Sequence, residues 1–324
     1  VESRGLGDVY KRQVVLQMGY SWKVALAAVL VEGIIFILLS LLSVREAIFD
    51  AIPYNLKKAV SVGIGLFIAF IGLQNAKVVI GGSTLLSLFS LDGYNKNLAA
   101  AAGGKDFVAA SMNDVGITVL LAIIGIIITG IMVVKNVKGN ILWGILITWV
   151  LGIICQFAGL YVPNPELGFY SLLPDFSAGI SIPSLSPIFA KFSLEGVPIL
   201  EFVVIVFAFL FVDLFDTLGT LIGVSSKANM LDKDGKLPRI KGALLADAVG
   251  TTAGAVLGTS TTTTFVESSS GVAEGGRTGL TAVTTAVLFG LSLFLSPIFL
   301  AIPSFATAPA LVIVGFYMLS AVTD

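Results

Sequence analysis

Two carboxylates stand three residues apart inside an apolar stretch of the chain. The segment Phe211–Thr220 reads FVDLFDTLGT, so Asp213 and Asp216 share one face of a helix, and Thr220 follows one turn later. A charge in hydrocarbon is costly, and carboxylates inside a membrane span usually face a cavity on the path of an ion or substrate. The alternative is that the side chain lies near the end of the span and reaches water. This alternative is stronger for Asp213 than for Asp216.

The second unusual segment is Gly258–Gly271, which reads GTSTTTTFVESSSG. A run of β-branched threonines favours extended backbone over helix. We therefore predict a short extended piece that leads into a half-helix, with Glu267 in its first turn. Irregular backbone of this kind forms substrate sites in secondary transporters, where free N–H groups and the helix dipole point at the ligand. The alternative is a threonine-rich loop outside the membrane.

Small residues recur every four positions in this part of the chain. They are Gly219 and Gly223, followed by Gly250, Gly254 and Gly258. Such spacing allows helix backbones to approach closely, so we interpret these glycines as packing residues and not as a site. Asp247 stands just before the second group, and its pattern is compatible with a site residue or with a hydrogen bond in the packing.

The composition indicates a membrane protein and excludes several kinds of chemistry. The 324 residues are 56% hydrophobic and 12% charged, whereas a soluble domain is typically about 25% charged. The absence of histidine excludes His-ligated haem or zinc and histidine-dependent nucleophilic catalysis, and the single Cys155 forms no intramolecular disulfide. We therefore predict no enzyme and no metal site. The net charge of -1 gives no indication of a nucleic-acid partner.

Apolar runs of about 20 residues predict the spanning helices. There are eight, at 22–42, 59–80, 115–134, 141–161, 199–224, 237–257, 278–300 and 305–322. The fold class is thus an all-α polytopic membrane protein with one irregular element. Loops 43–58, 135–140 and 225–241 hold ten Lys and Arg residues against three in the alternate loops, so we expect them to be cytoplasmic.

The stretch 211–284 resembles the AzgA-like adenine/guanine/hypoxanthine permeases of the nucleobase–cation symporter superfamily. Residues 63–76, GIGLFIAFIGLQNA, form a second family-like signature, and the resemblance covers 14–324. It implies a fold of 14 segments in two inverted repeats of seven, with a core and a gate domain, in which the irregular element is a short strand followed by a half-helix. The chain would be a fragment holding about segments 4 to 12, with core at 22–42 and 199–300 and gate at 59–161 and 305–322. We expect the polar residues 1–13 to be a non-native stretch.

The resemblance also implies a set of binding residues. Asp216 and Glu267 would hold the purine, because a carboxylate accepts from two N–H groups at once, and one of the two would carry the coupling proton, since burial favours the neutral acid. Backbone N–H groups near Val266 and Ser268 would donate to the base. The remaining predicted contacts are stacking by Phe215 or Phe265 and a polar contact from Thr220. No cofactor is expected apart from the coupling H+.

The predicted function is import of adenine, guanine or hypoxanthine through the cell membrane by proton symport and alternating access. A homodimer through the gate is implied by the family. Alternatives are a carrier for uracil or xanthine, or an anion carrier of the same fold, although two carboxylates would repel an anion. An ion channel fits less well because the threonine tract is single, and a membrane hydrolase lacks a histidine base. The preferred purine and the choice of proton or sodium stay open.

Overall fold

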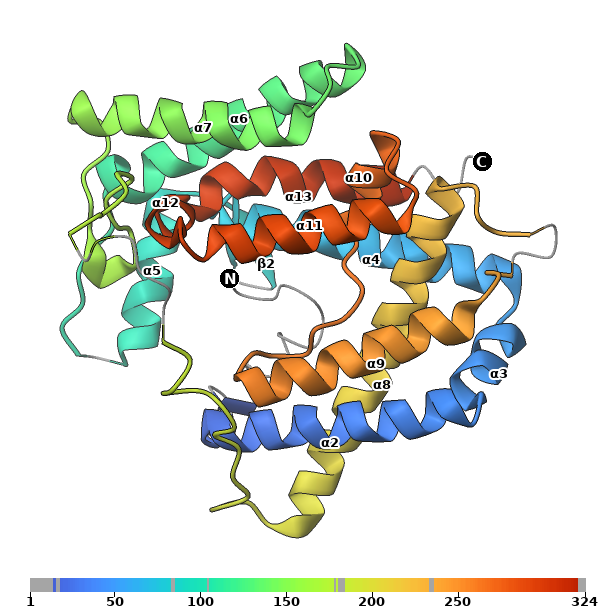
Figure 1. Cartoon of the computed structure of the whole chain (residues 1–324). Coiled ribbons are helices and arrows are strands. Elements are labelled where there is room, and N and C mark those ends of the chain that lie inside the picture. Colours follow the sequence, from blue (N-terminus) through green and yellow to red (C-terminus); the bar gives the residue numbers. More distant parts are fainter. Residues whose placement is uncertain are drawn as a thin grey trace. The chain divides into compact units, whose positions relative to one another are not determined.

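The computed structural model describes residues 14–15, 18–82, 85–103, 105–177, 179, 184–232 and 236–319 (Figure 1). The predicted non-native stretch 1–13 lies outside these residues. The chain divides into two compact units, which we call the first unit (Val1–Ile64, Pro183–Val272 and Met318–Asp324) and the second unit (Gly65–Ile182 and Ala273–Tyr317). Their boundaries are not those of the predicted core and gate, and the assignment of core and gate stays a prediction.

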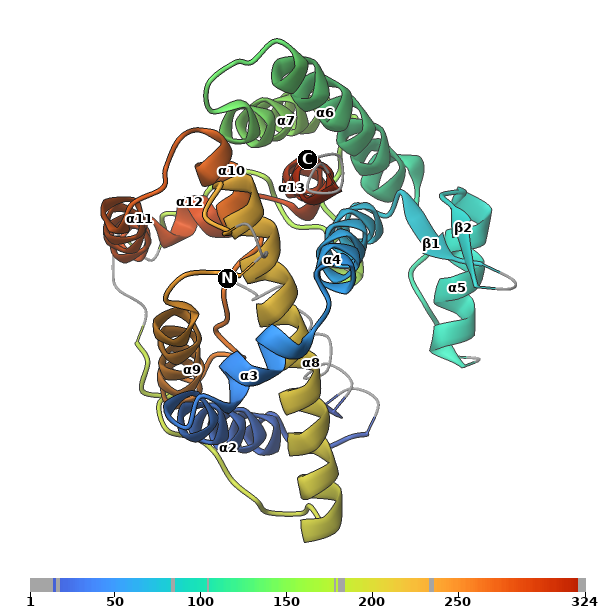
Figure 2. The ribbon, with the colours of Figure 1, turned by 90° about the vertical axis from the view of Figure 1, so that its right-hand side faces the viewer.

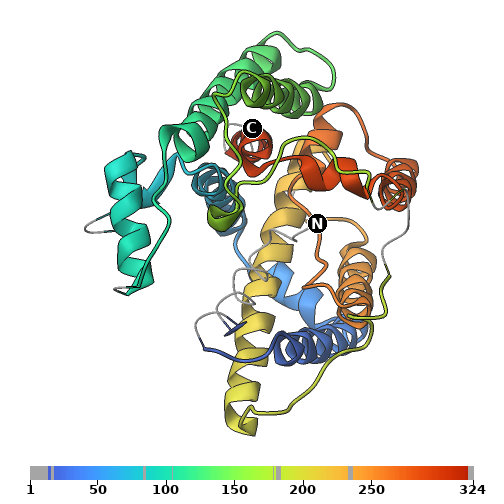
Figure 3. The same ribbon diagram turned by 90° about the vertical axis from the view of Figure 1, so that its left-hand side faces the viewer.

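The first unit is built from long helices packed side by side. Its elements are α2 (Trp22–Leu41), α3 (Val44–Ala51), the first half of α4 (Tyr54–Asn75), α8 (Ile199–Lys227), α9 (Ile240–Leu257) and most of α10 (Ser268–Ala273). Helix α2 packs along α9 and also contacts α8, and α2 and α9 lie side by side in Figures 1 and 3. This close packing depends on Gly33, because a Cβ there would lie 2.9 Å from the backbone nitrogen of Thr252.

The second unit combines helices with a small hairpin. Its elements are the end of α4, β1 (Val79–Gly81), β2 (Leu86–Leu88), α5 (Leu91–Ala102), the π-helical turn η2 (Met112–Gly116), α6 (Ile117–Val134), α7 (Asn140–Phe157), the 3-10 turn η3 (Pro165–Leu167), α11 (Gly279–Ser292), α12 (Ser296–Ala301) and most of α13 (Ser304–Leu319). The strands pair antiparallel with Ile80 opposite Ser87, and Figure 2 shows them beside α5. Helices α6 and α7 pack against each other.

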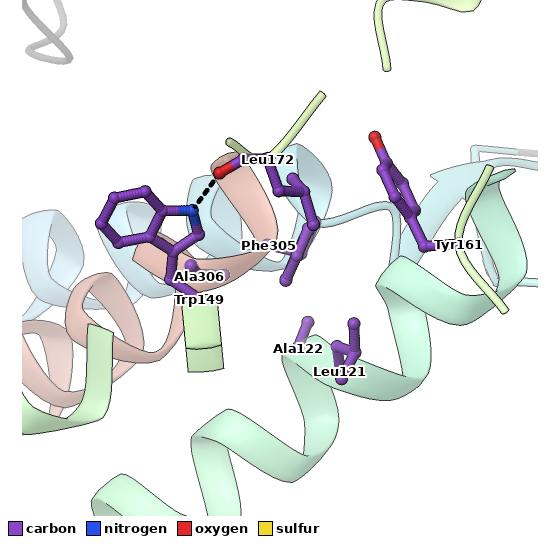
Figure 4. Packing of buried hydrophobic residues seen from close by; sticks show 9 residues of the cluster. Leu121, Ala122, Trp149, Tyr161, Leu172, Phe305 and Ala306 are labelled. Atoms are coloured by element: carbon purple, nitrogen blue, oxygen red, sulfur yellow. Dashed lines mark hydrogen bonds between the residues drawn. The ribbon is translucent and has the colours of Figure 1, made fainter. Parts of the chain in front are cut away.

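An apolar cluster forms the core of the second unit (Figure 4). Trp149 of α7 and Phe305 of α13 are both buried there, together with Leu172 from the segment after α7. The indole Nε1 of Trp149 donates a hydrogen bond to the carbonyl of Leu172 at 3.0 Å. This bond satisfies the one polar group of a buried tryptophan and ties the connecting segment to the helices.

Within the described residues, five helices are long and apolar enough to cross a membrane, namely Trp22–Leu41, Asn55–Asn75, Met112–Val134, Asn140–Phe157 and Ile240–Leu257. Gly279–Ser292 and Ser304–Leu319 are apolar but shorter. Each of the five falls on a predicted span. The protein is therefore an integral membrane protein built mainly from helices.

Three predicted elements differ in the structure. The span 278–300 is broken into α11 and α12, because Pro297 in the first turn of α12 has no N–H to continue a helix. The span 59–80 ends at Asn75, where Lys77 adopts a left-handed φ of 63° and the Val78 N–H caps the Leu73 carbonyl at 2.9 Å.

The third difference is the strand predicted within the threonine-rich segment. Among the described residues the strands are β1 and β2 alone, and 259–265 has no regular secondary structure. A strand needs a neighbouring strand to satisfy its backbone groups. Here side chains of α9 supply part of that satisfaction, so the segment is extended without a ladder.

Candidate functional site: a buried polar cluster in the first unit

One face of α8 carries the polar residues that the sequence analysis singled out. Asp213, Asp216, Thr217 and Thr220 are all buried, and their spacing of three and four residues places them on a single helix face. The hydroxyl of Thr220 is buried without a hydrogen-bond partner among the described residues. A polar face of this kind inside an apolar helix is suited to binding a polar ligand or a proton.

Asp247 of α9 is the centre of the hydrogen bonds around this face. Its Oδ2 accepts from the hydroxyl of Thr217 at 3.1 Å and from Nη2 of Arg45 at 3.1 Å. Its Oδ1 accepts from the backbone N–H of Thr264 at 2.9 Å and from the hydroxyl of the same residue at 3.2 Å. The carboxylate thus joins α3, α8, α9 and the extended segment, which answers the question left open for Asp247 in favour of a structural hydrogen-bonding role.

Arg45 is the cation of the cluster and was not anticipated there. Its position in the predicted loop 43–58 indicated an exposed charge, whereas it lies on α3 and is fully buried. Nη1 donates to the carbonyl of Leu244 at 3.1 Å, and the guanidinium lies 4.0 Å from the centroid of the Phe36 ring. Arg45 and Asp247 form an ion pair in which neither side chain is exposed. A buried pair is tolerated only when such further contacts compensate for the lost water.

Glu32 of α2 also belongs to the cluster and was missed. Its side chain is fully buried, lies beside Asp213 and Thr261, and neither carboxylate oxygen has a hydrogen-bond partner among the described residues. A signal for it was present in the sequence, because Glu32 is the only acidic residue in the apolar run 22–42. The cost argument applied to Asp213 and Asp216 applies equally to Glu32.

Glycines of α9 allow the extended segment to lie against that helix. A Cβ at Gly250 would lie 3.2 Å from the carbonyl oxygen of Thr262, and one at Gly254 would lie 3.0 Å from Cγ2 of Thr259. The Thr262 carbonyl also accepts from the hydroxyl of Thr251 at 3.2 Å. The predicted packing role of these glycines is confirmed, although their partner is an extended segment and not a helix.

The other glycines divide between two roles. Gly219 lies against α4, where a Cβ would come within 2.8 Å of Cγ1 of Val60, so it is a packing residue as predicted. Gly258 instead ends α9 with φ of 87°, a left-handed conformation that suits a residue without a Cβ. Gly258 therefore fixes the point at which the backbone leaves α9 and the extended segment begins.

The remaining predicted site residues follow the extended segment or flank the α8 face. Glu267 is half-buried and stands just before Ser268, the first residue of the six-residue α10, and not within the helix as predicted. Its carbonyl accepts from the N–H of Ser270 at 3.0 Å. Val266 is buried, whereas Phe265 is 40% exposed and Ser268 is exposed.

Phe215 lies beside the polar face of α8 and not on it. It is half-buried, and its ring centroid is 4.9 Å from that of Phe211, one turn earlier. Since successive helical residues are rotated by about 100°, Phe215 is offset from Asp216 around the helix. The roles of these residues in binding stay predictions.

The cluster can exchange protons and accept hydrogen bonds from N–H donors. It holds four buried carboxylic side chains, Glu32, Asp213, Asp216 and Asp247, beside the single guanidinium of Arg45. Within the described part of the chain, no three His, Cys, Asp or Glu side chains are grouped as metal ligands. Carboxyl groups buried between apolar helices are typical of secondary transporters that couple a solute to an ion.

Comparison with known proteins agrees with this class. Residues 11–324 match the model of the permease family Xan_ur_permease, so the chain belongs to that family. It is 45% identical over 302 residues to a permease of Methanocaldococcus jannaschii, which covers 93% of this chain and 61% of the relative. The family is one of permeases and not of enzymes, and the predicted resemblance to nucleobase permeases is confirmed at the level of the superfamily.

Two further relatives carry names that state a substrate. The guanine/hypoxanthine permease PbuG of Bacillus subtilis is 41% identical over 303 residues, covering 93% of this chain and 60% of PbuG. The adenine permease AdeQ of Escherichia coli is 35% identical over 318 residues, covering 98% of this chain and 63% of AdeQ. The chain thus spans about three fifths of the length of the curated relatives it matches.

A solved structure supports the fold. The transmembrane domain of the cyanobacterial bicarbonate transporter BicA matches with a TM-score of 0.59 at 17% identity, covering 97% of this chain and 72% of that domain. At this identity the likeness concerns the fold alone. The predicted fold class, a helical transporter of this type, is confirmed, apart from the missing strand.

Proposed function

We propose that the protein takes up purine nucleobases, adenine, guanine or hypoxanthine, across the cell membrane by proton symport. The observation that carries the proposal is the buried polar face of α8, with Asp216 and the unpartnered hydroxyl of Thr220. The names of PbuG and AdeQ support purines as the substrate class. Transport would proceed by alternating access, as secondary transporters of inverted-repeat architecture do.

The chemistry of the cluster suits a neutral heterocycle better than an anion. A purine offers ring and exocyclic N–H groups, and Asp216 and Glu267 would each accept such donors. Val266 and Ser268 would offer backbone N–H groups, and Phe215 or Phe265 would stack on the flat face of the base. An anion such as bicarbonate would meet buried carboxylates of its own sign, so the likeness to BicA does not favour an anionic substrate.

Uptake of radiolabelled hypoxanthine and adenine tests the proposal. The full gene product would be expressed in cells that lack purine permeases, with and without a protonophore. We expect saturable uptake that collapses when the proton gradient is removed. Absence of purine uptake by a protein inserted at normal levels would refute the substrate assignment, and uptake that survives the protonophore would refute proton coupling.

Two substitutions test the binding residues. Asp216→Asn and Glu267→Gln remove a charged acceptor with little change of shape, so each should abolish uptake while the protein still inserts. Matched controls are Asp175→Asn and Glu195→Gln, because both of these side chains are exposed. Wild-type uptake by the Glu267→Gln variant would remove that residue from the proposed site.

A further inference from the structure

Glu32 and Asp213 are two buried carboxyl groups that lie next to each other from different helices. Glu32 comes from α2 and Asp213 from α8, and their exposed fractions are 0% and 1%. Neither oxygen of Glu32 nor Oδ2 of Asp213 has a hydrogen-bond partner among the described residues. The remaining oxygen, Oδ1 of Asp213, accepts a long bond of 3.4 Å from the hydroxyl of Thr217, and the hydroxyl of Thr263 also faces Asp213. Three of the four oxygens are therefore buried without a hydrogen-bond partner in the part of the chain that the structure describes.

Among the described residues, Arg45 is the one cation found to face this pair. Ion pairs among the described residues include Arg45 with Asp247, Lys96 with Asp92, and Lys236 with Asp50, and none of these contains Glu32 or Asp213. Arg45 on α3 attracts Asp213, but its guanidinium is already hydrogen-bonded to Asp247. The other charged or titratable groups facing the pair are acidic, Asp247 from α9 and Asp216 from α8. The extended segment contributes only hydroxyls, those of Thr261 and Thr263.

The charges of Glu32 and Asp213 determine which protonation state of the pair is stable. Two ionised carboxylates side by side in a buried site repel each other, and a proton shared between them would remove that repulsion. A proton on Glu32 turns one unpartnered acceptor into a donor toward the unpartnered Oδ2 of Asp213. One bound proton thus removes the repulsion and supplies the missing donor.

We infer that Glu32 and Asp213 share one proton and that this is the proton that drives transport, an inference that rests on the proposed function. The proton comes from water on one side of the membrane and leaves to water on the other, with no other bond made or broken. This site is separate from Asp216 and Glu267, which the sequence analysis proposed as proton carriers. Asp213 lies one turn from Asp216, so the charge of the pair acts directly on the predicted purine site.

The decisive variant is Glu32→Gln, which keeps a donor to Asp213 but cannot release it as a proton. Glu195→Gln is the matched control, because Glu195 is exposed in the same unit. Two assays on the full gene product in proteoliposomes separate the roles: hypoxanthine accumulation driven by a proton gradient, and hypoxanthine exchange at equal pH on both sides. We expect Glu32→Gln to lose gradient-driven accumulation of hypoxanthine and to keep hypoxanthine exchange. We expect the same two results for Asp213→Asn.

Two results of these transport assays would overturn the inference. Gradient-driven accumulation at the wild-type level in Glu32→Gln would overturn the inference. Loss of exchange as well as accumulation in both variants, at normal insertion, would also overturn it, because the pair would then be part of purine binding. The control variant should match the wild type in both assays.

A spectroscopic measurement keeps this inference distinct from the purine assignment. A protonated carboxyl group has a carbonyl stretch in the infrared that ionised carboxylates lack, so a pH titration of the purified protein detects the shared proton without any substrate. We expect one such band in the wild type and in Glu195→Gln, and its loss in Glu32→Gln. If the wild type transports no purine but shows this band, the purine proposal fails and the proton site stands. If the wild type shows no such band, the proton site fails.

Discussion

Both units bury polar side chains between helices, but they satisfy them in different ways. In the second unit the hydroxyls of Thr129 and Thr148 each donate to a carbonyl of their own helix, Gly125 and Gly144, at 2.7 Å. In the first unit the hydroxyl of Thr217 on α8 instead contacts Asp247 on α9 at 3.1 Å and Thr263 on the extended segment at 2.9 Å. A hydroxyl that bonds within its own helix needs no neighbour to satisfy it. A hydroxyl that bonds to another element is satisfied only while the two elements stay packed together.

The comparison separates packing from function. A threonine that bonds back to its own helix lets two helices approach without exposing a polar atom to hydrocarbon. The cluster around Asp247 costs more to bury, because it contains charges, and three carboxyl oxygens of Glu32 and Asp213 have no hydrogen-bond partner among the described residues. The unsatisfied carboxyl oxygens of Glu32 and Asp213 are therefore the place where a proton is expected.

The largest predicted effect concerns the buried ion pair. Arg45→Met leaves the carboxylate of Asp247 buried without its cation, and breaking such a pair costs about 3–5 kcal/mol. We expect severe loss of thermal stability in detergent, measured by size exclusion after heating. A double variant, Arg45→Met with Asp247→Leu, removes both charges and should recover much of the loss; no recovery would mean that the hydrogen bonds of Asp247, and not its charge, dominate.

The exposed pair Lys236–Asp50 is the matched control for that experiment. Its N–O distance of 3.0 Å is close to the 3.1 Å of Arg45–Asp247, but its side chains are 51% and 38% exposed. Water screens such a pair, so Lys236→Met should leave the stability nearly unchanged. An equal loss in both variants would show that burial does not distinguish the two pairs.

The next effect tests the bonds between elements in the first unit. Thr217→Val keeps the shape of the side chain but removes the hydroxyl that contacts Asp213, Asp247 and Thr263. Losing a buried donor while its acceptors stay costs about 1–3 kcal/mol. Thr285→Val in α11 is the control, because its hydroxyl bonds only within its own helix and is exposed. A thermal shift no larger than that of the control would contradict the role of Thr217.

The sequence predicted the membrane class and the helical face of α8, because both depend on local patterns. Intramembrane carboxylates at a spacing of three residues indicate a polar face wherever the helix packs. The threonine run likewise predicted backbone that is not helical. The same argument could have found Glu32, whose apolar surroundings match those of Asp213.

Contacts between distant elements could not be predicted in this way. The partnership of Arg45 with Asp247 joins residues 202 positions apart, and no local pattern distinguishes Arg45 from the loop lysines. The irregular backbone of the extended segment could be predicted, because it follows from the threonines. Its hydrogen bonds with Thr251 and Asp247 could not, because they depend on how α9 packs. The break at Pro297 was missed because hydropathy alone set the length of that span.

A smaller effect is expected from the core of the second unit. Trp149→Phe removes the N–H that bonds the carbonyl of Leu172 and leaves that buried acceptor unsatisfied. We expect a loss of about 1–3 kcal/mol in thermal stability. Trp143→Phe is the control on the same helix, because Trp143 is 52% exposed, and it should change stability little. Equal shifts would mean that the hydrogen bond contributes nothing beyond the aromatic surface.

The smallest effect concerns the contact between α6 and α7. A Cβ at Gly144 would lie 2.9 Å from Cγ2 and 3.1 Å from Cβ of Thr129, whereas one at Gly130 meets nothing within 4 Å. Alanine favours a helix over glycine by about 1 kcal/mol, so Gly130→Ala should leave stability unchanged or raise it. Gly144→Ala should lower it, because overpacking costs about 1–3 kcal/mol and exceeds that gain. If both variants gain stability, the helices have room to separate, and the close approach attributed to Thr129 and Gly144 is not what stabilises the second unit.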